Sequence, residues 1–336
     1  MKPIAAILLA VSLLAGAAQS AAAQSAAPLT IKLATLAPEG SPWHQIIRDM
    51  AEEWREVSGG RVVVRIYAGG VAGDEADVVR KMRVGQLHAA LLSGEGLSQV
   101  APEIHALQMP MMFRSYDELD YVRDRVAPEI EAILEAKGFK LLNWGDAGWA
   151  HIFARRPVVS PADLKPIRFF VSARSTAYVE AWKGAGYHPV PLAATDIYTA
   201  LQSGLIEALV TPPIAALSFQ WFGLAKHMSD LKLAPLVGGV VISTRTWQAV
   251  PDDLKPLLLE AASDAGARLK AIRNLDDDAI ETMKKHGLVV HHVPPEVAAE
   301  WERAIRAIYP KLIGPLVPAD MAAEVERLTS EYRASQ

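Results

Sequence analysis

Residues 30–67 read TIKLATLAPEGSPWHQIIRDMAEEWREVSGGRVVVRIY, and this stretch sets the architecture of the chain. Residues 30–36 alternate polar and apolar side chains and are rich in β-branched residues, which predicts a strand. Ser41 is placed to cap a helix whose first position is a proline. The glycine pair Gly59-Gly60 ends that helix, and the pattern of residues 61–67 predicts a second strand. A β–α–β unit of this kind indicates a parallel sheet.

The same alternation continues along the chain in two sets. After the glycine loop AGGVAGDE, the pattern predicts a helix at 74–84, a strand at 87–92, a helix at 116–136 and a strand at 140–144. A second set begins near residue 167 with a strand, followed by a helix at 175–184, a strand at 188–192, a helix at 195–203 and a strand at 206–211. Two such sets predict two α/β lobes.

A long helical stretch follows at residues 251–286, and at ~1.5 Å per residue it could span about 50 Å. A helix of that length can brace two lobes. We therefore expect an α/β, two-lobed clamp, braced by this helix, with a ligand cleft between the lobes. Lobe I is expected to comprise residues 24–148 plus about 240–275, and lobe II residues 149–239 plus about 276–336.

The first residues, MKPIAAILLAVSLLAGAAQSAAAQ, have the pattern of an export signal. Lys2 precedes an apolar stretch, and small residues end at Ala23, so we predict a signal peptide at 1–23 that is cleaved after Ala23. The alternative is an uncleaved membrane anchor, but the apolar stretch is short for a bilayer span. The sequence thus predicts export to the periplasm.

Composition excludes several classes of protein. The chain has 336 residues, a formal net charge of −4 and no long basic run, so we expect no nucleic-acid partner. Cysteine is absent, which rules out disulfides, thiolate metal sites and a cysteine nucleophile. An exported chain without disulfides must depend on a large packed core, for which this length is sufficient.

The sequence lacks the common motifs for catalysis, metal binding and cofactors. There is no HExxH motif, and the adjacent His291 and His292 would face opposite sides of a strand. The glycine loop before Asp74 matches neither GxGxxG nor GxxxxGK[ST], and the sequence around Ser93 lacks the GxSxG order. We therefore expect no catalytic residues, no metal, no cofactor and no enzyme activity.

Several blocks, in the same order along the whole mature chain, resemble one family. They include IKLATLAPEGSPWHQ, LQMPMMFRSYDELDYV and, as the most specific, PVPLAATDIYTALQSGLIEA. The sequence resembles the DctP-type solute-binding subunits of TRAP transporters. That resemblance implies a two-lobed clamp of the periplasmic-binding-protein type, located in the periplasm, that captures a small organic solute, usually an organic acid. It also implies delivery to a permease of one small and one large membrane subunit. We expect a monomer, and a sensor that reports ligand to a membrane kinase remains an alternative.

The resemblance also indicates the ligand site. In the family, DLKG is usually followed by LKIRV, whose arginine grips the ligand carboxylate. Here the segment from Asp163 reads DLKPIRFFV, which places Phe170 at the arginine position and Arg168 at the preceding lysine position. A second family arginine follows the W-x-x-x-G strand, and Ala150 stands there. Thr211 stands where the family often has an asparagine.

These replacements change the expected ligand. An arginine–carboxylate pair makes two parallel charge-assisted hydrogen bonds. A carboxylate enclosed without such a partner loses its hydration uncompensated, at a cost of at least several kcal/mol. We therefore expect a ligand less anionic and more apolar or aromatic than the usual dicarboxylates, with Trp144, Trp149 and Phe170 as walls.

An organic acid held by a substitute arginine is the alternative. Arg168 shares strand parity with Phe170, and Arg174 lies just past the strand, so either could supply a guanidinium. A one-residue gap in the comparison would put Val171 at the key position, which is still not arginine. The expected polar contacts lie mostly at the carboxyl ends of strands, where open α/β sheets bind ligands: Thr35, Glu39, Ser93, Glu95 and Thr211.

Overall fold

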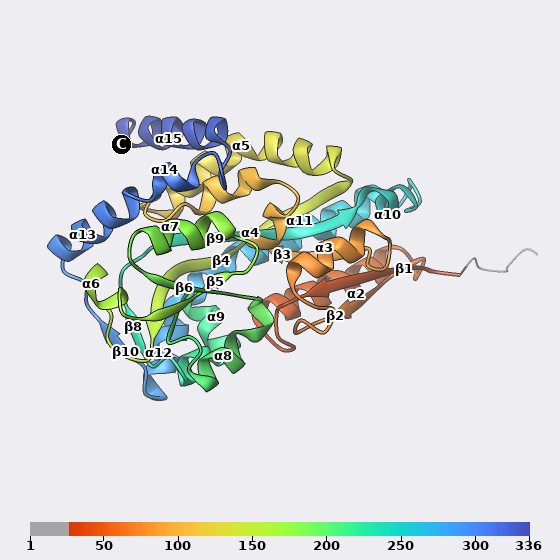
Figure 1. The fold of residues 1–336 in the computed structure, drawn as a ribbon. Coiled ribbons are helices and arrows are strands. Elements are labelled where there is room, and N and C mark those ends of the chain that lie inside the picture. The colour runs from red at the N-terminus through yellow and green to blue at the C-terminus, as the bar shows by residue number, and fades with distance from the viewer. Residues whose placement is uncertain (1–26) are drawn as a thin grey trace, which may run out of the picture.

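The computed structural model describes residues 27–336, and the predicted signal peptide at 1–23 lies outside that range. Its strands form one continuous path in the order β2-β1-β3-β9-β4-β7-β5-β6, with β8 and β10 joined to it through β4. Helices cover both faces of this sheet (Figure 1). The α/β fold class expected from the sequence is confirmed.

The lobe I half of the sheet comprises β2 (Val62–Tyr67), β1 (Leu29–Thr35), β3 (Ala89–Ser93), β9 (Ala234–Ser243) and the first part of β4 (Phe139–Ala154). β1 is parallel to both β2 and β3, whereas β9 is antiparallel to β3 and β4. The sequence pattern of residues 30–67 therefore predicted this unit correctly. Ser41 caps α2 (Pro42–Val57) as expected, since its Oγ accepts a hydrogen bond from the His44 N–H.

Two apolar layers hold this half together. One face of the sheet packs on α2 and α11 (Lys255–Ala271), with Ile31 and Leu33 of β1 in that core. The other face packs on α3 (Glu75–Arg83), α4 (Gly94–Ser98), η2 (Pro102–Gln108) and α5 (Tyr116–Ala136). Period-two alternation along β1 sends neighbouring side chains to opposite cores.

β4 is longer than the predicted strand at 140–144 and joins the two lobes. Its first part pairs with β9, and from His151 onward it pairs with β7 (Ala208–Thr211). Register shifts occur between Leu141 and Asn143 and between Asp146 and Gly148. A bulge bends a strand and increases its twist, so β4 can pass from one lobe to the other at this point.

The lobe II half is built on β5, with both faces covered. Its elements are α6 (Pro161–Leu164), β5 (Arg168–Ser172), α7 (Thr176–Gly184), β6 (His188–Leu192), η3 (Ala194–Asp196), α8 (Ile197–Ser203), β7, α9 (Pro213–Ser218), η4 (Trp221–Gly223), β8 (His227–Ser229), β10 (Val289–His291), α13 (Pro295–Arg306) and α14 (Tyr309–Leu312). β5 is parallel to β6 and β7. Phe169 belongs to the core that contains α7 and α13, and Phe170 to the core that contains α8 and α9.

The predicted bracing helix at 251–286 is present in three parts. The short α10 (Thr244–Gln248) precedes it, then α11 is followed by η5 (Ile272–Leu275) and α12 (Asp276–Lys285). α11 packs against α2 and β4, whereas α12 packs against α9. The helical path therefore contacts both lobes, as expected, but it tightens into a 3-10 turn between them.

The C-terminal helix α15 (Ala319–Ala334) packs against α5 and η2. Tyr121 donates to Glu331 at 2.6 Å, and Arg333 pairs with Glu118 at 2.5 Å. The expected division assigned residues 276–336 to lobe II, whereas α15 packs on α5, which that division assigned to lobe I. Within residues 27–336, no helix has the length and apolarity that a membrane span requires.

Candidate ligand-binding site

A cavity of about 420 Å³ opens where the two halves of the sheet meet. Four residues at the carboxyl ends of strands line it: Thr35 of β1, Ser93 of β3, Ser172 of β5 and Thr211 of β7. Open α/β sheets bind ligands at this edge, because the loops that follow the strands converge there. The strand order thus places one cavity against both lobes.

The lobe I wall of the cavity carries buried carboxyl groups. Ser93 donates its backbone N–H and its hydroxyl to the two oxygens of Glu75, each at 2.6 Å. Burial raises the pKa of the Glu75 carboxyl from 4.5 to about 7, and the bonds from Ser93 oppose that rise. A Cβ atom on Gly96 would lie 2.9 Å from the Glu75 carboxyl carbon, so a larger residue at this position would displace the carboxyl group. Burial also raises the pKa of Asp74.

A direct hydrogen bond closes the lobes on each other. Ser175, at the start of α7 in lobe II, donates its hydroxyl to Glu95 of α4 in lobe I at 3.0 Å. Ser175 is buried, and both residues line the cavity. This bond joins the polar ends of the two lobes beside the cavity.

Positive charge in the cavity is sparse. Among the described residues, Arg174 is the one lysine or arginine of the lining, and His105 is the one histidine. Burial lowers the pKa of His105, which favours its neutral form. The lining therefore offers one guanidinium.

Of the ten ligand-binding residues predicted from the sequence, six line the cavity and four do not. Those that line the cavity are Thr35, Ser93, Glu95, Phe170, Arg174 and Thr211. Ala150, at the second position where the resemblance implies an arginine, also lines it. The remaining four predicted residues do not: Glu39, Trp144, Trp149 and Arg168.

Arg168 cannot act as the substitute anchor in this structure. Its guanidinium lies at the end of α8, where it donates to the carbonyl oxygens of Gly204 at 2.7 Å and Leu205 at 3.1 Å. It also lies 3.6 Å from Glu207. These contacts lie outside the cavity, so Arg174 alone retains the alternative role.

The two predicted tryptophan walls also lie elsewhere. Trp144 donates its indole N–H to Glu131 of α5 at 2.8 Å. Trp149 is buried edge-to-face against Tyr116, with ring centroids 5.3 Å apart. Glu39 is exposed on the loop after β1. Phe170 is therefore the one predicted aromatic wall that faces the cavity.

Several lining residues were not predicted as contacts, including Asp74, Glu75, His105 and Ser175. The rule that open α/β sheets bind ligands at the carboxyl ends of their strands, which identified Ser93, would also have identified some of these residues. Asp74 and Glu75 follow the loop after β2, and Ser175 follows β5, so all lie just beyond strand ends. No comparable signal marks His105, which lies in η2.

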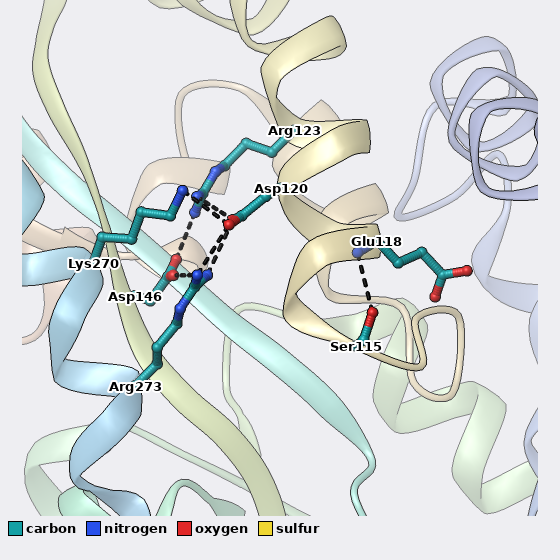
Figure 2. Close-up of polar contacts among 7 residues, drawn as sticks. All are labelled: Ser115, Glu118, Asp120, Arg123, Asp146, Lys270 and Arg273. Carbon is teal, nitrogen blue, oxygen red and sulfur yellow. Dashed lines mark hydrogen bonds and ion pairs between the residues drawn. The ribbon is translucent and has the colours of Figure 1, made fainter. Parts of the chain in front are cut away.

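A buried charge network supports the crossing between the lobes (Figure 2). Arg123 of α5 donates to Asp146 of β4 at 2.6 Å, and Arg273 of η5 contacts the same carboxylate at 3.1 Å. Asp120 accepts from Arg273 at 3.0 Å and pairs with Lys270 of α11 at 2.9 Å. The network thus ties α5 and the bracing helix to the bulge of β4.

Asp276 adds a second tie at this crossing. Its carboxylate accepts the backbone N–H groups of Trp149 at 3.1 Å and Ile214 at 3.3 Å. Burial raises the pKa of Asp276 to about 6, and these hydrogen bonds oppose the rise. Arg273 within η5 and Asp276 directly after it therefore both attach this 3-10 turn to the crossing between the lobes.

The site has the features of a binding protein. Within residues 27–336, no three histidine, aspartate or glutamate side chains converge so as to hold a metal ion. Two α/β lobes, a crossing segment between them and a cavity at the junction define a two-lobed solute-binding clamp.

Comparison with known proteins identifies the family. The sequence profile of the bacterial extracellular solute-binding protein family 7 (DctP) matches residues 33–314. The chain therefore belongs to this family, whose members bind solutes and are not enzymes.

Individual relatives agree with this assignment. The solute-binding protein RD1_1052 of Roseobacter denitrificans is 26% identical over 239 residues, which cover 70% of this chain and 73% of that protein. A periplasmic TRAP solute-binding protein of Sulfurospirillum deleyianum with bound succinate has a TM-score of 0.83 and 24% identity, covering 90% of this chain and all of that one. Its counterpart from Ralstonia eutropha with bound (S)-2-acetolactate has a TM-score of 0.82 and 22% identity, covering 90% and 99%. These two structures share the fold.

Proposed function

We propose that this chain is a periplasmic binding protein that delivers a small organic solute to a TRAP-type permease of one small and one large membrane subunit. The solute carries at most one carboxylate and a largely apolar body. It is thus less anionic and more apolar than a dicarboxylate. Family membership supports the binding role, and the cavity lining supports the ligand class.

The observation that carries the ligand class is the balance of charge in the cavity. Arg174 is the one guanidinium of the described lining, against the carboxyl groups of Asp74, Glu75, Glu95 and Asp146, the last of which is already paired with arginines outside the lining. One guanidinium can pair with one carboxylate in a fork of two hydrogen bonds. A second carboxylate would be desolvated beside like charges, which costs several kcal/mol.

The ligands of related proteins support the presence of a carboxylate in the proposed solute. The proteins with the same fold hold succinate, which has two carboxylates, and (S)-2-acetolactate, which has one. A carboxylate is therefore common to both ligands, whereas the limit to one carboxylate rests on the cavity lining of this chain. Phe170 and Ala150 stand where the resemblance implies arginines, and both line the cavity. A single acid group at Arg174, with Phe170 beside it and an apolar remainder deeper in the cavity, satisfies both observations.

Calorimetry with two four-carbon acids tests the ligand class. Butanoate and succinate differ by one carboxylate, and we expect butanoate to bind at least ~10-fold more tightly, because only one acid group finds a partner. Arg174→Ala should weaken butanoate binding ~10-fold or more, the usual contribution of a charged hydrogen bond. Arg168→Ala is the matched control and should change it less than about twofold.

The opposite ranking would contradict the proposal. Tighter binding of succinate that persists in Arg174→Ala would show a second anionic subsite. Delivery is tested separately in the host cell: deletion of this gene should abolish uptake of the solute that binds best, and deletion of the permease subunits should have the same effect. Unchanged uptake in either strain would contradict the transport role.

A further inference from the structure

The cavity does not end at the cleft between the lobes. Its lining continues into lobe II, on the face of β5 that carries Phe169 and that α7 and α13 cover. We call this part the lobe II arm, and its residues are all apolar or aromatic: Leu164, Phe169, Trp182, Trp301, Ile305, Leu312, Leu316 and Val317. The Trp301 indole N–H is already bonded to the Val159 carbonyl at 2.7 Å. The arm thus offers hydrocarbon contacts.

Helix α7 shows how polarity changes along the cavity. Ser175, Tyr178 and Trp182 are spaced three and four residues apart, so they lie along one face of this helix, and all three line the cavity. Ser175 bonds to Glu95 at the cleft, and Trp182 packs edge-to-face on Phe169 with centroids 5.6 Å apart. Tyr178 lies between them, and burial raises the pKa of its hydroxyl. The lining passes from polar to apolar within two turns.

The helix also gives the length of the arm. Trp182 lies seven positions after Ser175, which at ~1.5 Å per residue is about 10 Å. An extended chain of three bonds spans ~3.8 Å, so about 10 Å accommodates roughly eight bonds, a chain of about eight or nine carbon atoms. Arg174 lies next to Ser175, at the polar end of this path.

We propose that the solute is a medium-chain monocarboxylate whose acid group pairs with Arg174 and whose hydrocarbon chain enters the lobe II arm. This inference rests on the proposed function and narrows its ligand class. Phe169 marks the wall of the arm, and Phe170, on the opposite face of the strand, borders the cleft. The two phenylalanines thus separate the tail from the head of the ligand.

A series of straight-chain acids tests the arm. Calorimetry with butanoate, hexanoate, octanoate and decanoate should show affinity rising ~3- to 4-fold per added methylene, because each buries about the same apolar area. The rise should stop near eight carbons, at the end of the arm. Trp182→Phe enlarges the arm and should move the best chain length upward by about one or two carbons.

A variant that blocks the lobe II arm and a matched control distinguish binding in the arm from general effects of the substitution on folding or affinity. Leu316 is half-buried in the arm, and Leu316→Trp should lower octanoate affinity ~10-fold or more while butanoate affinity changes less than twofold. Ile313 is also half-buried against the same core but does not line the cavity, so Ile313→Trp should leave both affinities near wild type. Thermal unfolding of each variant checks that it is folded.

The outcomes distinguish the arm from the proposed function. If butanoate binds but affinity does not change with chain length, the arm is refuted and a short-chain monocarboxylate remains the ligand class. If octanoate loses no affinity in folded Leu316→Trp, the arm is refuted as well. If no acid of the series binds but succinate or a sugar acid does, both the arm and the proposed ligand class are wrong.

Discussion

Glu75 provides a direct test of the electrostatics of the cavity. Its side chain is 7% exposed, and Ser93 donates two hydrogen bonds to it. Replacing it by glutamine keeps the shape and removes the charge. Because burial raises the pKa of Glu75 from 4.5 to about 7, the folded protein holds a proton that the unfolded chain releases over this pH interval.

The sign and size of the effect follow from that difference. A carboxyl whose pKa is raised on folding favours the folded state fully below its ordinary pKa, and this contribution is lost as the pH rises towards the folded value. At 1.36 kcal/mol per pKa unit, a change from 4.5 to about 7 corresponds to roughly 3 kcal/mol. Wild type should therefore lose stability relative to Glu75→Gln with rising pH.

Urea unfolding followed by tryptophan fluorescence measures this difference. Between about pH 5 and pH 8, the free energy of unfolding of Glu75→Gln minus that of wild type should increase by roughly 2–3 kcal/mol. Asp77→Asn removes a carboxylate from the exposed face of the same helix and is the control. A difference that stays constant or decreases with pH would refute the reasoning, and would show that Ser93 holds Glu75 ionised in the folded protein.

Two further predictions concern the lobe crossing and the cavity wall. Arg123→Met should lower the free energy of unfolding by about 3 kcal/mol, because it removes one partner of the Asp146 carboxylate, which is 1% exposed. Arg268 on α11 is half-exposed, so Arg268→Met should change the free energy of unfolding by less than about 1 kcal/mol. Equal losses in urea titrations would contradict this. Phe170→Arg should raise succinate affinity ~10-fold or more by supplying a second guanidinium, as calorimetry can measure; no gain in a folded variant would argue against the position.

Strong local patterns allowed most of the fold to be predicted. The helix at 116–136 and the strand at 188–192 have the predicted bounds, because their periodicity and end signals agree. β4 was predicted too short, because Gly145 and Gly148 interrupt the strand pattern at the place where the bulge lies. The break at η5 was missed because its segment, Ile272–Leu275, contains no glycine or proline to mark it, while the contacts of Arg273 come from distant parts of the chain.

Position along a strand accounts for several of the residues that line the cavity. Thr35, Ser93 and Thr211 follow from the rule that ligands bind at the carboxyl ends of parallel strands. The tryptophans of β4 could not be placed in this way, because an extra residue at a bulge changes the face that later side chains take. Trp149 follows the second register shift and packs in the core.

The two ends of the cavity contribute to binding in different ways. The lobe II arm lies within one lobe, so a hydrocarbon chain could bury its surface there before the lobes close. The polar end is different, because Glu95 comes from lobe I and Ser175 from lobe II, and their contact exists only when the lobes meet. Chain length would then change affinity mainly through lobe II, whereas the acid group beside Arg174 would act on closure itself. A solute that has a hydrocarbon chain of suitable length but lacks the acid group should therefore bind this clamp without closing the lobes.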